Sequence, residues 1–192
     1  SIMKIGVFGG SFNPIHNGHI ALAQYVLDEN LADEVWFVVS PLNPFKQNAD
    51  LLSDEKRLCM TTAALEGKVG MYVSDFEFSM PRPSYMVNTL DSLHSTYSDR
   101  EFLLFIGADN WQSFHRWYHY EDILNKYTIY VYPRSDIQVD ETSLPCNVHL
   151  LHSPLICMSS TDIRDKLKAG ESIDDIVPPK VAEIIYQNKF YQ

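Results

Sequence analysis

The sequence predicts an α/β fold, in which a doubly wound, mostly parallel sheet is covered by helices on both faces. Apolar runs typical of buried strands alternate with helical patterns, beginning with a strand–helix–strand unit at residues 4–10, 15–30 and 33–41. The strand segments are continuous apolar runs, which indicates strands buried on both faces. In such sheets ligands bind beyond the carboxyl ends of the strands, so residues that follow strands are the candidates for a site.

A helix is predicted next, over residues 53–67. Ser53 is a suitable N-cap, and Asp54 and Glu55 lie in the first turn, where the helix dipole favours negative charge. Gly67 is a typical stop signal. This segment therefore continues the alternation of strand and helix.

The rest of the chain repeats the alternation, with capping signals at its last helices. The predicted elements are a strand at 70–78, a helix at 84–97, a strand at 101–109 that opens into an aromatic-rich helix, strands at 127–133 and 147–152, and helices at 159–170 and 178–188. Serines precede the helix at 159–170 and Gly170 ends it, while prolines open the last helix. The polar stretch 134–145 is predicted to be a surface excursion.

Length and charge limit the classes of function. The 192 residues, 45% of them hydrophobic, predict a single domain over residues 1–192, and we expect Ser1 and Ile2, which precede Met3, to be a cloning remnant. Fifteen Lys and Arg against 25 Asp and Glu give a net charge of −10, which disfavours nucleic-acid and membrane partners. A small anionic ligand stays compatible, because it needs only local positive groups.

The cysteines suggest neither a disulfide framework nor a zinc site. Cys59, Cys146 and Cys157 are odd in number, far apart and without C-x-x-C spacing. We expect buried thiols in a reducing environment. The chain also shows no apolar run of the roughly 18 to 20 residues needed to span a bilayer and no signal-peptide pattern, so a cytoplasmic protein is expected.

The stretch GGSFNPIHNGH, residues 9–19, follows the first predicted strand. Gly9 and Gly10 allow a close approach of the backbone to a ligand. Asn13 is expected to cap the following helix with Pro14 in its first turn, which would leave free N–H groups for an anion. Neither G-x-G-x-x-G nor the P-loop pattern is present, so no familiar phosphate motif applies.

Two histidines add to this anion site. His16 and His19 are three residues apart, on one face of the predicted helix, and Gly18 between them leaves room for a ligand. Both imidazoles would donate to the same anion. The alternatives are a glycine turn with two solvated or core histidines, and a metal site, for which no further ligand falls at a suitable spacing. The position after the first strand favours phosphate binding.

Several segments together resemble a known family. GGSFNPIHNGH resembles the signature of the nucleotidylyltransferase superfamily, and MSSTDIR, residues 158–164, resembles its second element, with Met158 in place of the usual isoleucine. Alone, SSTDIR would indicate only an N-cap and an amphipathic helix. Further matching segments are SPLNPFK at 40–46, PSYMVNTL at 83–90, FIGADN at 105–110 followed by Trp117, and YPRS at 132–135. With the glycine pair, these most resemble the bacterial nicotinate mononucleotide adenylyltransferase family; the phosphopantetheine branch is shorter and lacks that pair.

The resemblance implies a Rossmann-like nucleotidylyltransferase fold and a set of site residues. The implied residues are catalytic His16, His19, Lys46 and Arg164; ATP-binding Gly9, Gly10, Ser11, Phe12, Gly18, Gly107, Asp109, Arg134, Ser159 and Ser160; and mononucleotide-binding Asn13, Lys46, Tyr85, Met86 and Trp117. Tyr85 and Trp117 match positions that sandwich a pyridine ring, and Met86 replaces a threonine. Without the resemblance, Lys46 and Arg134 would pass as surface cations, Asp109 as a helix cap, and both aromatics as core.

The implied reaction transfers the adenylyl group of ATP to nicotinate mononucleotide in NAD biosynthesis and releases pyrophosphate. The attacking phosphate is already largely a dianion at pH 7, so positioning and charge stabilisation suffice without a nucleophilic side chain. Mg²⁺ would be bound mainly through ATP phosphates, with no protein metal site. The alternatives are transfer to nicotinamide mononucleotide or another phosphorylated acceptor, and a nucleotide-binding module without turnover. We expect small-molecule partners only and leave open a homo-oligomer.

Overall fold

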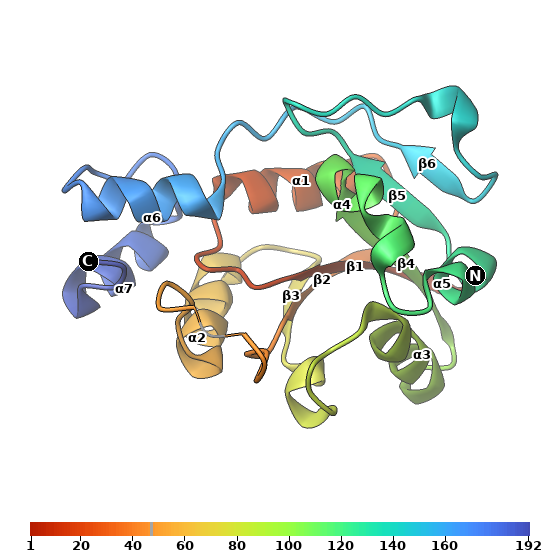
Figure 1. The fold of residues 1–192 in the computed structure, drawn as a ribbon, viewed down its shortest axis with the longest axis horizontal. Helices are drawn as coiled ribbons and strands as arrows, with labels where there is room; N and C mark the ends of the chain where they lie inside the picture. Colours follow the sequence, from red (N-terminus) through yellow and green to blue (C-terminus); the bar gives the residue numbers. More distant parts are fainter. Residues whose placement is uncertain (47) are drawn as a thin grey trace.

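Six strands form one sheet in the computed structural model, which describes residues 1–46 and 48–192 (Figure 1). The strands are β1 (Met3–Gly10), β2 (Glu34–Val39), β3 (Met71–Ser74), β4 (Arg100–Gly107), β5 (Ile129–Tyr132) and β6 (Val148–Leu150). Their order is β3-β2-β1-β4-β5-β6, and each neighbouring pair is parallel. The predicted doubly wound α/β class is confirmed, with these six strands parallel throughout.

Helices cover both faces of the sheet (Figure 1). They are α1 (Asn17–Asp28), α2 (Asp54–Leu65), α3 (Met86–Thr96), α4 (Ala108–Gln112), α5 (Tyr120–Lys126), α6 (Ser160–Lys168) and α7 (Pro179–Asn188). Alternate residues of β2 enter two separate cores: Phe37 belongs to the core that includes residues of α1, α2, α6 and α7, whereas Val38 belongs to the core that includes residues of α3, α4 and α5. Because successive side chains of a strand point to opposite faces, a continuous apolar run supplies both cores.

The switch point of the sheet lies between β1 and β4. The chain proceeds outward from β1 through β2 to β3, then returns to pair β4 with the other side of β1, with Phe8 opposite Phe105. In sheets of this kind a crevice opens at the carboxyl ends of the two strands that flank the reversal. Those ends are Gly10 on β1 and Gly107 on β4.

The strand predicted at 70–78 is shorter than expected. It ends at Ser74, and a 3₁₀ turn follows at Phe76–Ser79. Ser74 is the last residue of β3 that pairs with β2, and its hydroxyl accepts the N–H of Phe76 at 3.2 Å, which turns the chain away from the sheet. The apolar pattern extends beyond the end of the strand because the side chains that follow pack in the interior, although their backbone groups do not pair with a neighbouring strand.

The predicted aromatic-rich helix after β4 is broken into three pieces. Between α4 and α5 lies a 3₁₀ turn at Phe114–Arg116, and His119 adopts a left-handed backbone conformation with φ 50°. The rings of Trp111, Phe114 and Trp117 pack in sequence with centroids 5.4 and 5.0 Å apart. Their burial in one row outweighs helical continuity.

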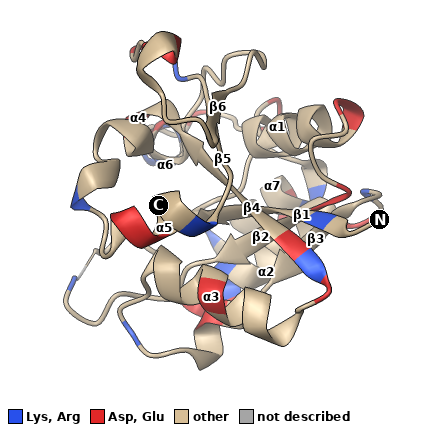
Figure 2. Cartoon of the chain, turned by 90° about the vertical axis from the view of Figure 1, so that its right-hand side faces the viewer, with Lys and Arg blue, Asp and Glu red and all other residues tan. Residues whose placement is uncertain are grey.

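The expectation that the cysteines are buried is wrong. All three are free, as expected, but they are exposed rather than buried. Figure 2 shows that basic residues and acidic residues both occur on many different helices, strands and loops. Among the described residues, no helix combines the length and apolarity needed to cross a membrane. The stretch 134–145 lies at the surface as predicted, with a short 3₁₀ turn at Glu141–Ser143.

Candidate functional site

A cavity of about 280 Å³ lies at the switch point of the sheet. It is lined by Phe8, Gly9, Gly10, Ser11, Phe12, His16, His19, Leu22, Phe105, Asp109, Asn110, Tyr132, Arg134, Ser159 and Ser160. Residues of the opening glycine stretch, of the ends of β4 and β5, and of the start of α6 thus meet in one place. Most of the ATP-binding residues implied by the resemblance are among them.

The two histidines form a reciprocal cap at the start of α1. His16 is the N-cap, and its Nδ1 accepts the N–H of Gly18 at 3.0 Å, while Nδ1 of His19 accepts the N–H of His16 at 3.1 Å. The two rings stack with centroids 3.7 Å apart. Because each Nδ1 is an acceptor, the proton of each neutral ring lies on Nε2, which is then free to donate.

Electrostatics keep both rings neutral. Burial, and then the positive charge of Arg134, lower the pKa of His16 to about 4. Burial first, then the charges of His16 and Arg134, lower the pKa of His19 well below its ordinary 6.5. The cavity therefore offers two oriented Nε2–H donors beside a guanidinium at neutral pH, rather than two imidazolium charges.

The expected cap of α1 by Asn13 is wrong. Asn13 is buried, and its amide group donates to the carbonyl of Asp50 at 2.8 Å and accepts from the N–H of Leu52 and the hydroxyl of Tyr191 at 3.3 and 2.6 Å. Its side chain therefore ties the glycine stretch to the loop before α2 and to the C-terminal end of the chain. The N–H groups expected to be free at the start of α1 include two that the histidine rings already occupy.

Helix α6 is held against the glycine stretch by its own side chains. Ser159 and Asp162 form a capping box, and the hydroxyl of Ser160 donates to the carbonyl of Pro14 at 2.8 Å. Nη1 of Arg164 donates to the carbonyl of Asn13 at 2.9 Å. Arg164 thus lies beside the lining of the cavity. Described residues engage two of its five N–H donors, one on the carbonyl of Asn13 and one on the hydroxyl of Thr161.

Close packing explains the glycine at the end of β4. A Cβ on Gly107 would lie 2.5 Å from Oδ1 of Asp109 and 3.0 Å from the ring of Tyr132. Asp109 in the first turn of α4 therefore comes close to the backbone of the strand end. A larger side chain at position 107 would displace two residues that line the cavity.

A second cavity, of about 310 Å³, adjoins the first at His16. The start of α1 forms one wall, and residues 153–158 form the other. A Cβ on Gly18 would lie 2.6 Å from Cγ2 of Ile156 and 2.8 Å from Cε1 of His16, so the glycine permits this close approach. The wall at 153–158 was not predicted from the sequence, where its only signal is its place directly before the SSTDIR segment.

The residues implied for mononucleotide binding lie outside these cavities, on loops and at the start of α3. Lys46 is exposed in the loop after β2. Tyr85, the N-cap of α3, is 40% exposed, and its ring centroid lies 4.5 Å from that of Tyr118. Trp117 is instead partly buried against Phe114.

Tyr118 is thus an aromatic partner that was not predicted from the sequence, although it directly follows Trp117. Met86, at the start of α3, approaches β1 closely enough for a Cβ on Gly9 to meet its Cε at 2.7 Å. Met86 therefore lies beside the end of β1, on the side of α3.

A larger cavity, of about 980 Å³, lies at the opposite end of β4, near Arg100 and Lys126. None of the residues implied for the site lines it. Among the described residues, no three or more His, Cys, Asp or Glu side chains are grouped so that they could hold a metal ion.

Comparisons with known proteins agree with the fold. A family model described as cytidylyltransferase-like matches residues 7–166. A relative from Bacteroides fragilis (strain YCH46) is 50% identical over 184 residues, which cover 96% of this chain and 92% of the relative. One from Flavobacterium johnsoniae is 41% identical over 192 residues, which cover 99% of this chain and 100% of the relative. Both carry the name "Probable nicotinate-nucleotide adenylyltransferase".

Solved structures share the architecture. A Plasmodium falciparum nicotinic acid mononucleotide adenylyltransferase complexed with NaAD superposes with a TM-score of 0.85, over 98% of this chain and 97% of that chain, at 20% identity. The complex of the same protein with APC gives a TM-score of 0.82, again at 20% identity. These matches show that this fold extends over 98% of the chain.

Proposed function

This chain belongs to the cytidylyltransferase-like family, and from that premise we propose that it is a nicotinate-nucleotide adenylyltransferase of NAD biosynthesis. It joins the phosphate of nicotinate mononucleotide to the α-phosphorus of ATP and releases pyrophosphate. The observation that carries the proposal is the pair of neutral, stacked histidines, which present two Nε2–H donors in a cavity at the switch point.

In this proposal the phosphates of ATP lie in the 280 Å³ cavity, where His16, His19 and Arg134 surround them. The base occupies the adjoining, mostly apolar cavity lined by the start of α1 and residues 153–158, which shares His16 with the lining of the phosphate site. A flat purine suits such a narrow apolar cavity. Gly107 and Asp109 provide a close backbone and a carboxylate for ribose hydroxyls.

The transfer needs no side-chain nucleophile or general base. A phosphate monoester with a second pKa of about 6 is mostly a dianion at pH 7, so its oxygen attacks the α-phosphorus directly while the bond to the leaving pyrophosphate oxygen breaks. His16 and His19 donate to phosphate oxygens, and Arg134 offsets their charge. The guanidinium of Arg164, already fixed on Asn13, keeps further donors that suit bidentate phosphate contacts.

Mg²⁺ would be held mainly by phosphate oxygens and water. Such sites typically use one or two carboxylates at most, which suits the donor set found here, where no cluster of acidic or imidazole ligands occurs among the described residues. When bound, the ion neutralises charge on the phosphates. The contribution of the chain is to orient those phosphates through the histidines and the start of α6.

The acceptor would lie against the loops that carry Lys46 and Tyr85, beside Asn13, Met86 and Trp117. Tyr85 makes no side-chain capping hydrogen bond to any described residue, and the first N–H groups of an α-helix have no partner within the helix. A pyridine carboxylate at the start of α3 would accept from the N–H of Met86 and gain from the helix dipole. The N–H of Trp117 already donates to Phe114, so it adds nothing to this contact.

The single domain would act in the cytoplasm on small-molecule substrates, without nucleic-acid or membrane partners, and a homo-oligomer is compatible with it. Two alternative functions differ in chemistry. One is the same transfer to nicotinamide mononucleotide or another phosphorylated acceptor. The other is a nucleotide-binding module without turnover.

One assay separates these functions. Pyrophosphate release is measured with ATP, Mg²⁺ and either nicotinate or nicotinamide mononucleotide. Because the carboxamide would set an NH₂ against the Met86 N–H, we expect kcat/KM to favour nicotinate by about 5- to 150-fold, equivalent to one unpaired donor at roughly 1 to 3 kcal/mol. Met86→Thr should change this ratio little, since the contact uses the backbone. Equal efficiencies would favour the nicotinamide alternative, and ATP binding without pyrophosphate release would favour the module.

A further inference from the structure

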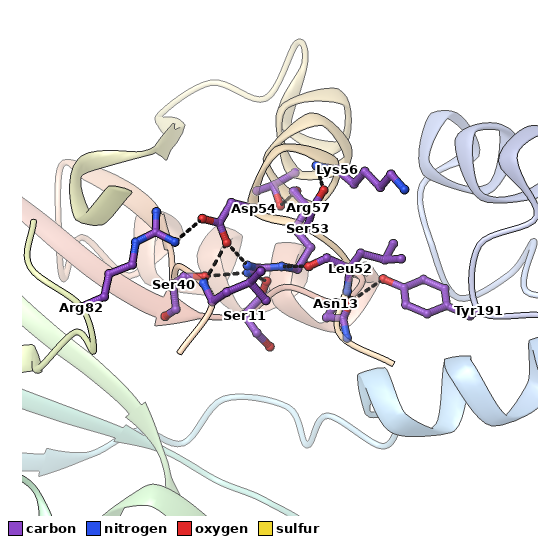
Figure 3. A network of polar contacts seen from close by, with 12 residues as sticks. Ser11, Asn13, Ser40, Leu52, Ser53, Asp54, Lys56, Arg57, Arg82 and Tyr191 are labelled. Carbon is purple, nitrogen blue, oxygen red and sulfur yellow. Dashed lines mark hydrogen bonds and ion pairs between the residues drawn. The ribbon is translucent and has the colours of Figure 1, made fainter. Parts of the chain in front are cut away.

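A buried arginine joins three backbone segments around the glycine stretch. The side chain of Arg57, on α2, is fully buried. Its Nε donates to the carbonyl of Leu52 at 2.8 Å, and its Nη1 donates to the carbonyls of Ser11 and Ser40 at 2.9 and 2.6 Å (Figure 3). Ser11 lines the phosphate cavity and Ser40 follows β2. Arg57 therefore fixes the loop after β2 relative to that cavity.

Asp54 extends this arrangement to a third loop. Its Oδ1 accepts from the N–H of Leu42 and from Nη2 of Arg57, both at 2.8 Å. Its Oδ2 pairs with Nη1 of Arg82 at 2.8 Å, as Figure 3 shows. Asp54 lies in the first turn of α2, where the helix dipole stabilises a carboxylate. One carboxylate thus connects the loop after β2 to the loop before α3.

These two loops carry the residues proposed to bind the acceptor. The first leads through Phe45, which is 81% exposed, to Lys46, and the second leads directly from Arg82 to Tyr85. Pro81 and Pro83 flank Arg82, and each proline fixes its own φ and restricts the residue before it. Because this segment is stiff, the contact that holds Arg82 in place also restricts the position of Tyr85, three residues later.

Loss of the Arg82 ion pair should affect the position of the loop much more than the stability of the fold. The side chain of Arg82 is 34% exposed, and a partly exposed ion pair contributes only about 0 to 1 kcal/mol to folding. Removal of Arg82 should therefore leave the fold intact while the loop loses its fixed position. This differs from Arg57, whose loss would leave buried partners unpaired.

We propose that Arg82 is a positioning residue for the mononucleotide subsite: through Asp54 it fixes the Tyr85 loop relative to the Lys46 loop. The proposal rests on the function proposed above for its choice of substrate. Its structural basis, the coupling of the two loops through Asp54, does not depend on that function.

The test compares Arg82→Ala with Arg82→Lys and a matched control. The control is Lys180→Ala, which removes another exposed ion pair, to Glu66 at 2.7 Å, between α7 and the end of α2. We expect Arg82→Ala to raise KM for nicotinate mononucleotide about tenfold, with kcat and KM for ATP changed less than about twofold. Arg82→Lys should recover most of the loss, since it can keep one contact with Asp54. The control should match the wild type.

A second measurement tests the coupling of the two loops and does not depend on turnover. Hydrogen exchange over residues 82–88 should be faster in Arg82→Ala than in the wild type, and near wild type in Arg82→Lys and in the control. Unchanged exchange in Arg82→Ala, an equal rise of KM for both substrates, or a lysine variant no better than alanine would each overturn the proposal. If the wild type does not turn over the mononucleotide, the proposed function fails, and exchange alone then decides whether the coupling exists.

Discussion

At the scale of single residues, the two nitrogens of His19 separate its structural role from its proposed role in catalysis. Nδ1 accepts the N–H of His16 in the reciprocal cap, which leaves Nε2 as the proposed donor to phosphate. Glutamine can place an N–H near the position of Nε2, whereas asparagine can place an oxygen near that of Nδ1. We expect His19→Asn and His19→Ala to lose at least about 10² in kcat, and His19→Gln to lose less, because it keeps a donor.

Steady-state kinetics and thermal melting of all three variants check this prediction. His19→Asn should melt closer to the wild type than His19→Ala, since it can keep the acceptor for the His16 N–H. Near-wild-type kcat in His19→Ala, or equal kcat in the glutamine and asparagine variants, would contradict a donor role for Nε2.

The lowered pKa of His16 should make the free energy of unfolding depend on pH. Its pKa is about 4 in the folded protein against an ordinary 6.5, so the unfolded chain binds a proton between these values that the folded chain does not. The free energy of unfolding should therefore be highest above pH 6.5 and fall toward pH 4, by at most about 3 kcal/mol for this group. Burial lowers the pKa of His19 as well, which adds to the same trend.

Urea unfolding from pH 7.5 to 4 measures this slope. The control is His16→Asn, whose side-chain oxygen can still accept the Gly18 N–H but does not titrate, and its slope should be smaller. Hydrogen bonds from Ser159 lower the pKa of Asp162 from its ordinary 3.8, so that group loses its contribution only at lower pH. Equal slopes in the wild type and the variant would show that His16 is not the cause.

At the scale of elements, the start of α1 and the segment 153–158 meet at Gly18. Alanine normally favours a helix over glycine by up to about 1 kcal/mol. Here the added Cβ would lie 2.6 Å from Ile156 and 2.8 Å from the His16 ring, so either the cavity wall or the histidine must move. We expect Gly18→Ala to raise KM for ATP at least about tenfold without a gain in stability.

ATP titrations at saturating acceptor measure this effect. Gln24→Ala, on the exposed side of the same helix, is the control, and its KM for ATP should equal that of the wild type. A Gly18→Ala protein that binds ATP normally would show that the base does not occupy the cavity beside Ile156.

The apolar pattern identified the six strands in order, but it predicted one helix where α4 and α5 are separate, and it did not fix each boundary. The strand predicted through residue 78 ends at Ser74, where its pairing with β2 stops at Val38 and the hydroxyl of Ser74 accepts the N–H of Phe76. The helix predicted after β4 breaks because Trp111, Phe114 and Trp117 all enter one core. Both outcomes depend on neighbours distant in sequence, which periodicity within one segment does not report.

At the scale of the whole molecule, Arg57 joins the ends of β1 and β2 to α2. Arg57→Met would leave the carbonyls of Ser11 and Ser40 without their donor and remove one partner of Asp54. We expect a loss of about 3 kcal/mol in the free energy of unfolding, at the lower end of the cost of breaking a buried ion pair, because Asp54 keeps Arg82.

Urea unfolding at pH 7.5 measures the loss. Lys180→Met, which removes an exposed cation of comparable size, should change the free energy of unfolding by less than about 1 kcal/mol. If Arg57→Met were as stable as the wild type, the network would contribute no more than a hydrophobic side chain of similar volume, as occurs for some buried ion pairs.

By itself the sequence determined the class of fold and the position of the cavity at the switch point of the sheet. Buried parallel strands must be continuous apolar runs, and glycines and polar residues placed directly after them must meet at one edge of the sheet. Residues 9–19 follow the first such run and therefore belong to that edge, and the resemblance of the two motifs added the start of the helix at Ser159 and assigned the chemistry. Local pattern suffices for these features because each depends on secondary structure and chain direction.

Only the tertiary structure decided the state and the surroundings of those residues. The neutrality of His16 and His19 depends on burial and on Arg134, the partners of Asn13 come from the loop before α2 and from Tyr191, and Tyr118 meets Tyr85 across two loops. The wall of the second cavity at 153–158 likewise exists only where the chain returns to α1. Desolvation and contact across long chain separations depend on the packing of the whole molecule, which no local stretch of sequence contains.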